Sequence, residues 1–94
     1  MRVIWSRKAR RDLEAIQSFI GADNPEAADR VENAVVEITR RLASYPRLGH
    51  LQDGGFREII EPRYRYIVRY DVFSDDATAG RVHILSIWHP KQTR

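Results

Sequence analysis

The sequence lacks cysteine altogether and has no long apolar run. Without cysteine there is no disulfide and no thiolate chemistry, which suits a protein of a reducing compartment. No run of apolar residues approaches the roughly 18 residues that a membrane-spanning helix needs. The N-terminus has three apolar residues, Val3, Ile4 and Trp5, before charges resume, so it does not resemble a signal peptide. We therefore expect a cytoplasmic protein with no membrane partner.

The usual motifs for metal, nucleotide and covalent chemistry are also missing. There is no CxxC or HExxH pattern, and His50, His83 and His89 are scattered along the chain. No P-loop, GxGxxG or GxSxG motif occurs, and nothing in the order of residues places a Ser/His/Asp triad. The sequence thus predicts neither a metal site nor a cofactor.

Length and charge narrow the class further. The chain of 94 residues makes one domain, and its hydrophobic content of 43% is typical of a globular protein. The net charge is +3 and the pI is about 9.7. A positive net charge of this size is expected for a protein that binds nucleic acid or an acidic protein. Many small domains with this pI nevertheless bind no nucleic acid.

Three segments between residues 56 and 91 have the composition of β-strands, rich in β-branched and aromatic residues. Because strand side chains alternate between faces, one row of the central segment is predicted to face the helices: Tyr64, Tyr66, Val68, Tyr70 and Val72. The opposite row is Arg65, Ile67, Arg69, Asp71 and Phe73. In the last segment the same alternation predicts a helix-facing row and an outward row. The first is Val82, Ile84, Ser86 and Trp88, and the second is Arg81, His83, Leu85, Ile87 and His89. A polar turn is predicted at residues 74–80. One face of the sheet is therefore expected to carry Arg and His into solvent.

Two amphipathic helices precede these strands. Ser6 is a good N-cap, and apolar residues at helical spacing followed by Gly21 predict a helix over residues 7–21. Pro25 suits the first position of a second helix, whose apolar seam continues to about Tyr45 before Pro46.

The short connection between the two helices predicts an antiparallel hairpin. Residues 46–55 are predicted to form a loop, and residues 2–5 a first strand. The predicted order is β-α-α-β-β-β and the fold class is α+β, with the helical hairpin packed on one face of a mostly antiparallel sheet.

The first turn of the first helix is unusually basic. Arg7, Lys8, Arg10 and Arg11 crowd the positive end of the helix dipole, where a cation costs about 0.3–1 kcal/mol. This cluster is either a solvated face or a surface that meets an anionic partner.

The chemistry that remains belongs to basic side chains on the predicted strands. Arginine holds phosphate or carboxylate through two hydrogen bonds, and histidine exchanges a proton near neutral pH. Such groups suit metal-free RNA cleavage, with a base for the 2′-hydroxyl, arginines for the phosphate and an acid for the leaving group. They are equally suited to salt bridges on a solvated face. The candidates are Arg57, Arg65, Arg69, Arg81, His83, His89 and Lys91.

Several short motifs, in this order and spacing, resemble the ParE/RelE superfamily of bacterial toxins from type II toxin–antitoxin modules, and its ParE branch most closely. The resemblance covers nearly the whole chain. Its motifs are Ile4-Trp5-Ser6 with Ala9 and Asp12-Leu13, Asn24-Pro25-Glu26-Ala27-Ala28, Leu42 with Pro46 and Gly49, Arg57-Glu58-Ile59, Tyr66-Ile67-Val68-Arg69-Tyr70-Asp71-Val72, and Val82-His83-Ile84-Leu85-Ser86-Ile87-Trp88-His89.

The resemblance implies one of two activities. RelE-like members cut mRNA in the ribosome, whereas the characterised ParE-like members poison DNA gyrase and lack the nuclease residues. Nuclease members typically place an arginine three residues before the tyrosine of the central strand, and in the register set by Tyr70 that position is Ile67. Lysines are also scarce, since Lys8 and Lys91 are the only two, whereas nuclease members often carry several basic residues around the groove.

The resemblance therefore favours a protein inhibitor of gyrase over an enzyme. It also implies a ParD-like antitoxin as partner, with DNA bound only indirectly through that antitoxin. A ribosome-dependent endoribonuclease stays open, because a shifted register recruits Arg65 or Arg69 and because His89 matches the catalytic histidine of some nuclease members. A binding domain without toxicity is the third alternative.

These expectations assign residues to three surfaces. A nuclease would use Arg65, Arg69, Arg81 and His89. The target would be bound by the outer sheet face and the C-terminal segment, through Arg57, Arg65, Arg69, His89, Lys91 and Arg94. The antitoxin would meet Arg7, Arg10 and Arg11 and the apolar residues Ile16, Phe19 and Ile20, because a disordered partner segment can fold onto exposed apolar surface.

Overall fold

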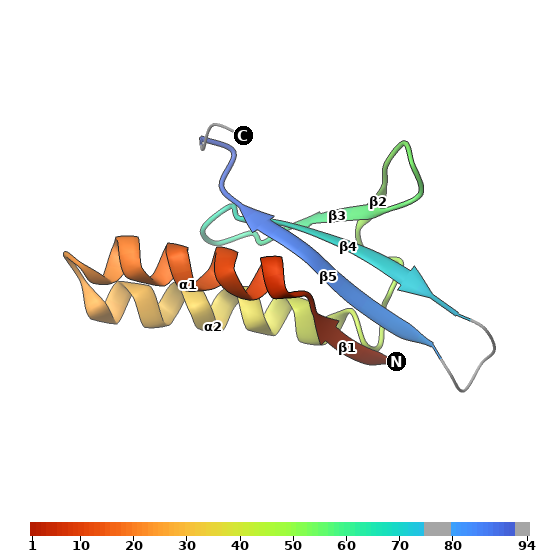
Figure 1. Cartoon of the computed structure of the whole chain (residues 1–94), viewed down its shortest axis with the longest axis horizontal. Helices are drawn as coiled ribbons and strands as arrows, with labels where there is room; N and C mark the ends of the chain where they lie inside the picture. Colours follow the sequence, from red (N-terminus) through yellow and green to blue (C-terminus); the bar gives the residue numbers. More distant parts are fainter. Residues whose placement is uncertain (75–79, 92–94) are drawn as a thin grey trace.

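The computed structural model describes residues 1–74 and 80–91, so most of the predicted polar turn and Arg94 lie outside the described residues. A helical hairpin packs against one face of a five-stranded sheet of order β1-β5-β4-β3-β2 (Figure 1). The predicted class and the order of elements are confirmed, with one additional short strand. The elements are β1 (Arg2–Trp5), α1 (Arg7–Gly21), α2 (Pro25–Arg41), β2 (His50–Leu51), β3 (Arg57–Ile60), β4 (Ile67–Phe73) and β5 (Arg81–Trp88).

Both helices begin where the capping residues predict. Ser6 Oγ accepts a hydrogen bond of 3.0 Å from the Ala9 N–H, and the Asn24 side chain accepts one of 3.1 Å from the Ala27 N–H. Each contact satisfies a backbone donor that the helix itself leaves unpaired. Neither helix, nor any other in the described part of the chain, is long and apolar enough to cross a membrane.

The second helix is shorter than predicted. It ends at Arg41 rather than near Tyr45, because the chain tightens there into turns with hydrogen bonds from Ala43 to Arg40 and from Ser44 to Arg41. A proline at position 46 disfavours helical backbone in the preceding residue, which explains why the apolar pattern outruns the helix.

The sheet is mostly antiparallel, as predicted. Only β1 runs parallel to its neighbour, β5, and the other pairs are antiparallel. The additional strand β2 lies in the segment predicted as loop and pairs with β3 through His50 and Leu51. Two residues carry too little alternation to be recognised as a strand in the sequence.

A β-bulge divides β5 into two halves. Arg69 of β4 pairs with Ser86, whereas the next residue, Tyr70, pairs with Ile84. Leu85 is therefore an extra residue without a partner on β4, and the alternation of side chains is inverted beyond it.

The bulge makes the predicted faces wrong for the last part of β5. Ile87, predicted to face outward, is 3% exposed and belongs to the core. Trp88, predicted to face the helices, lies beside the Arg69 guanidinium of the open face. Ser86, which pairs with Arg69, and His89, which follows Trp88, change sides for the same reason.

The helix-facing row of the central strand is confirmed. Val68 and Tyr70 are fully buried, and Tyr64, Tyr66 and Val72 pack against the core. The helices contribute their apolar seams to the same cluster, whose members there are Ala9, Ile16, Val31, Val35 and Ile38, with Leu42 just after α2.

The loop after α2 is fixed onto the buried Tyr70. Its hydroxyl donates to the Pro46 carbonyl at 2.8 Å and accepts from the Gly49 N–H at 2.8 Å. A Cβ on Gly49 would lie 2.7 Å from that hydroxyl and 2.8 Å from the Glu58 carbonyl. Burial raises the pKa of Tyr70, while the Gly49 hydrogen bond and the charge of Arg57 oppose the shift.

Arg65 is not on the central strand, as its predicted row required. The strand β4 begins at Ile67, and Arg65 lies in the preceding turn with φ of 70°. The carboxylate of Glu61, which is 4% exposed, accepts hydrogen bonds from the backbone of Arg63 and Tyr64 and holds this turn.

Candidate functional site

A groove of about 680 Å³ lies between α1 and the C-terminal end of β5. Its wall on α1 combines a lysine, an acid and an aromatic ring. Its opposite wall is aromatic and basic. The lining residues are Lys8, Asp12, Ala15, Ile16, Phe19, Tyr66, Ile87, Trp88, His89 and Lys91.

Two polar side chains of the α1 region hold β5 in place beside the groove. The Ser6 hydroxyl donates to the Leu85 carbonyl at 3.1 Å, so the N-cap of α1 also binds the bulge. One turn into the helix, the Asp12 carboxylate accepts from the Ile87 N–H at 2.9 Å and pairs with Lys8 at 3.0 Å. The bulge would otherwise leave local backbone groups without ladder partners, and Ser6 and Asp12 supply two of them.

His89 lies on the helix side of the sheet, within this groove. Its ring meets the Tyr66 ring edge-on, with centroids 5.2 Å apart, and its Nδ1 accepts from the Lys91 N–H at 3.2 Å. Burial raises the pKa of Tyr66. A neutral tyrosine and a half-buried imidazole therefore lie side by side in a groove that Lys8 and Lys91 also line.

The open face of the sheet is centred on Arg69 rather than on a free basic cluster. Its Nε and Nη2 donate to Glu58 Oε2 at 3.0 and 2.8 Å. Its guanidinium carbon lies 4.3 Å from the Phe56 ring centroid and 5.1 Å from that of Trp88. A planar cation between aromatic rings gains cation–π attraction, so this arginine is held by three neighbours.

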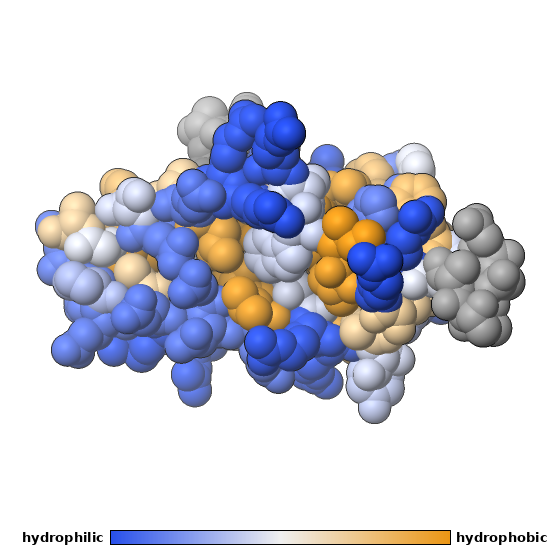
Figure 2. Space-filling view, turned by 60° about the horizontal axis from the view of Figure 1, so that its bottom comes forward, coloured by the Kyte–Doolittle hydropathy of each residue, from blue (hydrophilic) through white to orange (hydrophobic). Residues whose placement is uncertain are grey.

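Register places four rows of side chains across the open face. An apolar row of Ile60, Ile67 and Trp88 lies at one end, beside the row of His50, Glu58, Arg69 and Ser86. The strand pairs Asp71–His83 and Phe73–Arg81 follow toward the other end. On the side shown in Figure 2, pale side chains of intermediate hydropathy separate the central apolar patches, and hydrophilic side chains surround them.

The four predicted nuclease residues do not form one site. Arg69 is on the open face and His89 is in the groove on the helix side. Arg81 begins β5, which places it about 23 Å along the strand from Trp88 at ~3.3 Å per residue. Arg65 is in the turn before β4. The described residues also contain no group of three His, Asp or Glu that could hold a metal ion.

The predicted target surface is likewise split. Arg57 shares the helix-facing side with its strand partner Tyr70 and donates to the Gly49 carbonyl at 2.9 Å, so it is not on the outer face. Lys91 is exposed and lines the groove with His89.

The predicted antitoxin surface needs one correction. Ile16 is 6% exposed and belongs to the core, because its helical position faces the sheet. Phe19 is 83% exposed, Ile20 is half-buried, and the three arginines Arg7, Arg10 and Arg11 are exposed. Phe19 is therefore the most exposed of the three apolar residues in the predicted surface.

Sequence reasoning missed several residues that shape these surfaces. Asp12 and Glu58 were noted only as parts of motifs, yet each is the anionic partner of a basic side chain. Phe56 and Trp88 were treated as strand formers. Helical spacing of Lys8 and Asp12 at i,i+4 was the one signal that predicts such a pair from the sequence alone.

The chain folds as a two-helix hairpin on a mixed five-stranded sheet, with a basic and aromatic groove beside α1. The sequence profile described as the ParE toxin of the type II toxin–antitoxin system parDE matches residues 3–94. The chain therefore belongs to the ParE toxin family.

Individual relatives agree with this assignment. Toxin RelE2 of Caulobacter vibrioides is 36% identical over 89 residues, covering 93% of this chain and 92% of the relative. The putative toxin Y4kP of Sinorhizobium fredii is 32% identical over 94 residues, covering 97% and 90%. A solved chain from the chromosomal ParDE TA system of P. aeruginosa superposes with a TM-score of 0.79 at 25% identity, covering 95% of both chains.

Proposed function

We propose that this toxin arrests growth by binding DNA gyrase as a protein inhibitor, and that a ParD-like antitoxin neutralises it. The observation that carries the proposal is the state of Arg69. Its guanidinium is bound twice by Glu58 and lies beside Phe56 and Trp88. A phosphate-binding arginine of a nuclease needs its donors directed at the substrate, whereas here two donors already serve a carboxylate.

The open face suits contact with a protein. Its apolar row includes Ile60, which is 52% exposed, and the half-buried Ile67 and Trp88. Aromatic and arginine side chains beside partly exposed aliphatic ones are typical of the energetic centre of an interface. We assign gyrase binding to this face around Arg69, together with the C-terminal segment that begins at His89 and includes Lys91. Arg94 belongs to the same proposal but lies outside the described residues.

The antitoxin is assigned to α1 and the groove. Phe19 offers exposed apolar area, and Arg7, Arg10 and Arg11 offer positive charge without an acidic residue in the first turn. A segment that is disordered alone and folds on binding would cover this surface. The toxin would contact DNA only indirectly, through the antitoxin. Both proteins would be cytoplasmic, as is the proposed target of the toxin.

The test follows mRNA and DNA separately after induction of the toxin in cells. Gyrase poisoning predicts DNA breaks, an SOS response and filamentation while mRNA stays intact, and it predicts inhibition of supercoiling by purified gyrase. Translation-dependent mRNA cleavage within minutes, with supercoiling unaffected, would refute the proposal. Co-expression with the small open reading frame adjacent to the gene should restore growth and give a complex that co-purifies.

A second candidate function is ribosome-dependent mRNA cleavage, and one observation favours it. His89 and Tyr66 are in ring contact beside Lys8 and Lys91 in the groove, and an imidazole near a phenol is able to transfer protons. In that case His89→Ala abolishes cleavage, whereas Arg65, which lies in the turn before β4 and does not line the groove, is not required. Unchanged growth arrest by His89→Ala excludes a nuclease centred on this groove.

A further inference from the structure

The strand β1 forms one edge of the sheet, and no other strand of residues 1–74 and 80–91 lies along its outer side. The Arg2 and Ser6 N–H groups donate to β5, to the carbonyls of Gly80 at 3.4 Å and Ile84 at 2.9 Å. Because successive residues of a strand direct their backbone groups to opposite edges, the N–H and C=O groups of Val3 and Trp5 point away from β5. Such a margin is a template on which another strand can pair.

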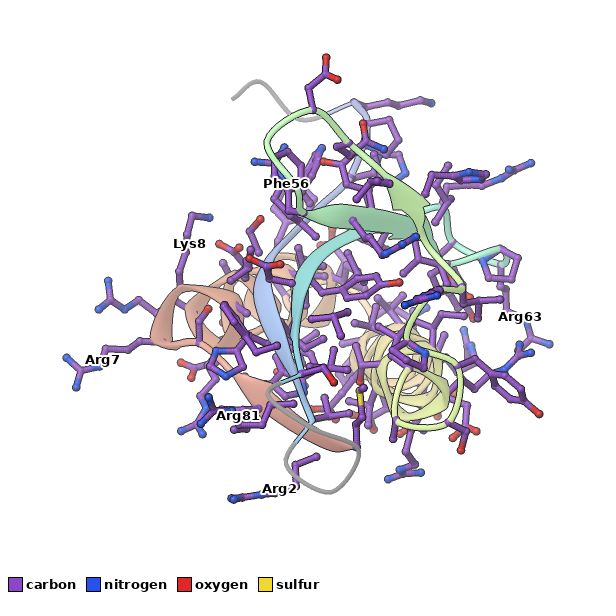
Figure 3. All side chains as sticks on the ribbon, turned by 90° about the vertical axis from the view of Figure 1, so that its right-hand side faces the viewer. Arg2, Arg7, Lys8, Phe56, Arg63 and Arg81 are labelled. Carbon is purple, nitrogen blue, oxygen red and sulfur yellow. The ribbon has the colours of Figure 1, made fainter. Side chains whose placement is uncertain are left out.

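A basic strip accompanies this margin. Arg2 of β1 and Arg81 of β5 are direct strand partners, so their exposed side chains lie on the same face. Arg7 begins α1 immediately after β1, and its side chain is exposed too. Figure 3 shows Arg2, Arg7 and Arg81 on one side of the molecule and Arg63 on the opposite side. No ion pair joins these three arginines to another described residue.

Arginines on neighbouring strands repel one another, and the positive end of α1 adds to the same field. A second copy of this chain paired along β1 would bring two such strips together, so the charges disfavour self-association. An extended segment with acidic side chains would instead relieve the repulsion while its backbone pairs with Val3 and Trp5.

We propose that the open edge of β1 binds an extended acidic segment of the antitoxin as a sixth strand, with carboxylates facing Arg2 and Arg81. The proposal rests on the proposed antitoxin partnership and adds a binding surface to it. Backbone pairing supplies affinity, and the arginines select an acidic partner over a neutral or basic one.

The test measures the affinity of the toxin for the protein product of the adjacent small open reading frame. Val3→Pro removes one outward N–H and leaves the bonds to β5 intact, because the groups directed at β5 belong to the alternate residues Arg2, Ile4 and Ser6. Val3→Ala is the matched control, since it also shortens the side chain but keeps the N–H. We expect the dissociation constant of Val3→Pro to exceed that of Val3→Ala by about five- to tenfold.

A second pair of variants tests the charges. Arg81→Glu should weaken binding about tenfold, with the difference shrinking as salt is raised, whereas Arg63→Glu on the opposite side should change it less than about twofold. The third measurement is amide hydrogen exchange on the wild-type complex. Val3 and Trp5 should gain at least about tenfold protection on binding, while the amide of Ile4, already directed at β5, should change little.

The outcomes separate the inference from the proposed function. If the partner binds wild type, Val3→Ala and Val3→Pro equally and the Val3 amide stays unprotected, the sixth strand is refuted and the antitoxin partnership stands. If the partner does not bind the wild-type toxin at all, the partnership itself fails and the inference fails with it.

Discussion

Polar side chains have different surroundings on the two faces of the sheet. On the helix-covered face, the hydroxyl of Tyr70 is fully enclosed and makes two hydrogen bonds within one loop. On the open face, Arg69 keeps about a third of its side chain in solvent while it binds Glu58 and two aromatic rings. The covered face thus uses polar contacts to fix the fold, whereas the open face holds a charge in place at the surface, where a partner can reach it. The substitutions below test this division.

The largest effect on stability is expected for Gly49→Ala. The new Cβ would meet the Tyr70 hydroxyl at 2.7 Å and the Glu58 carbonyl at 2.8 Å, so the loop must move off the covered face. We expect a loss of about 3 kcal/mol in the free energy of unfolding, measured by urea denaturation. Gly21→Ala is the control, because its Cβ would meet only the Ala28 Cβ at 3.6 Å and helical alanine is favoured by about 0.5–1 kcal/mol. Equal stability of the two variants would contradict the packing argument.

Tyr70→Phe should cost about 2 kcal/mol, because it leaves the Gly49 N–H and the Pro46 carbonyl without their buried partner. The raised pKa of Tyr70 adds a pH dependence. Below about pH 10 the tyrosine is neutral in both folded and unfolded chains, and above it the unfolded chain ionises first. Wild-type stability should therefore fall as the pH rises from about 10 through the folded-state pKa.

The alkaline measurement has its own control. The part of this fall that Tyr70 causes should vanish in Tyr70→Phe, while the part due to Tyr66, whose pKa is also raised by burial, should persist. An unaltered alkaline slope in Tyr70→Phe would show that the enclosed hydroxyl is not coupled to folding.

Asp12→Ala tests the contact between α1 and β5 beside the bulge. It removes the acceptor of the Ile87 N–H and the partner of Lys8, and we expect a loss of about 1–2 kcal/mol. Because this contact lies next to the bulge, hydrogen exchange at the Ile87 amide should accelerate more than exchange at the centre of α2. Lys8→Ala is the control, since the Lys8–Asp12 pair is exposed on the lysine side and should cost under about 0.5 kcal/mol.

Among the substitutions that are not controls, the smallest change in stability is expected for Arg69→Gln on the open face. Arg69→Gln removes a partly solvated ion pair, which contributes about 1 kcal/mol or less. The same variant should lose most inhibition of gyrase supercoiling if the face binds the target. Glu58→Gln is the control, because it removes the charge of the ion-pair partner but keeps Arg69 itself. A variant that is destabilised as strongly as Gly49→Ala, yet fully toxic, would reverse the division of roles between the faces.

Much of the fold follows from local signals in the sequence. Ser6 and Asn24 cap the two helices as their residue types predict, and the alternation in β4 assigns Val68 and Tyr70 to the core. The two residues of β2 carry too little alternation to be recognised as a strand, and the end of α2 differs from the prediction because the apolar pattern continues past Arg41.

The candidate sites were harder to predict because they depend on one register shift. In β5 the adjacent apolar residues Ile84 and Leu85 interrupt the alternation, but two apolar residues in a row do not by themselves show which of them is extra. The bulge is satisfied by groups distant in sequence, Ser6 and Asp12, which no local pattern contains. That single shift decides whether Trp88 or Ile87 faces the helices, and so which side His89 joins.

The bulge at Leu85 also has a consequence for variation in the gene. Loss of the Leu85 codon would join Ile84 directly to Ser86, so the pairs Tyr70–Ile84 and Arg69–Ser86 would become consecutive, and Ile87 and Trp88 would keep their present faces. Insertions and deletions are usually best tolerated in surface loops, yet this strand already holds one residue more than its ladder needs. A one-codon deletion scan across β5 should therefore tolerate the loss of the half-buried Leu85 better than the loss of the fully buried Val82.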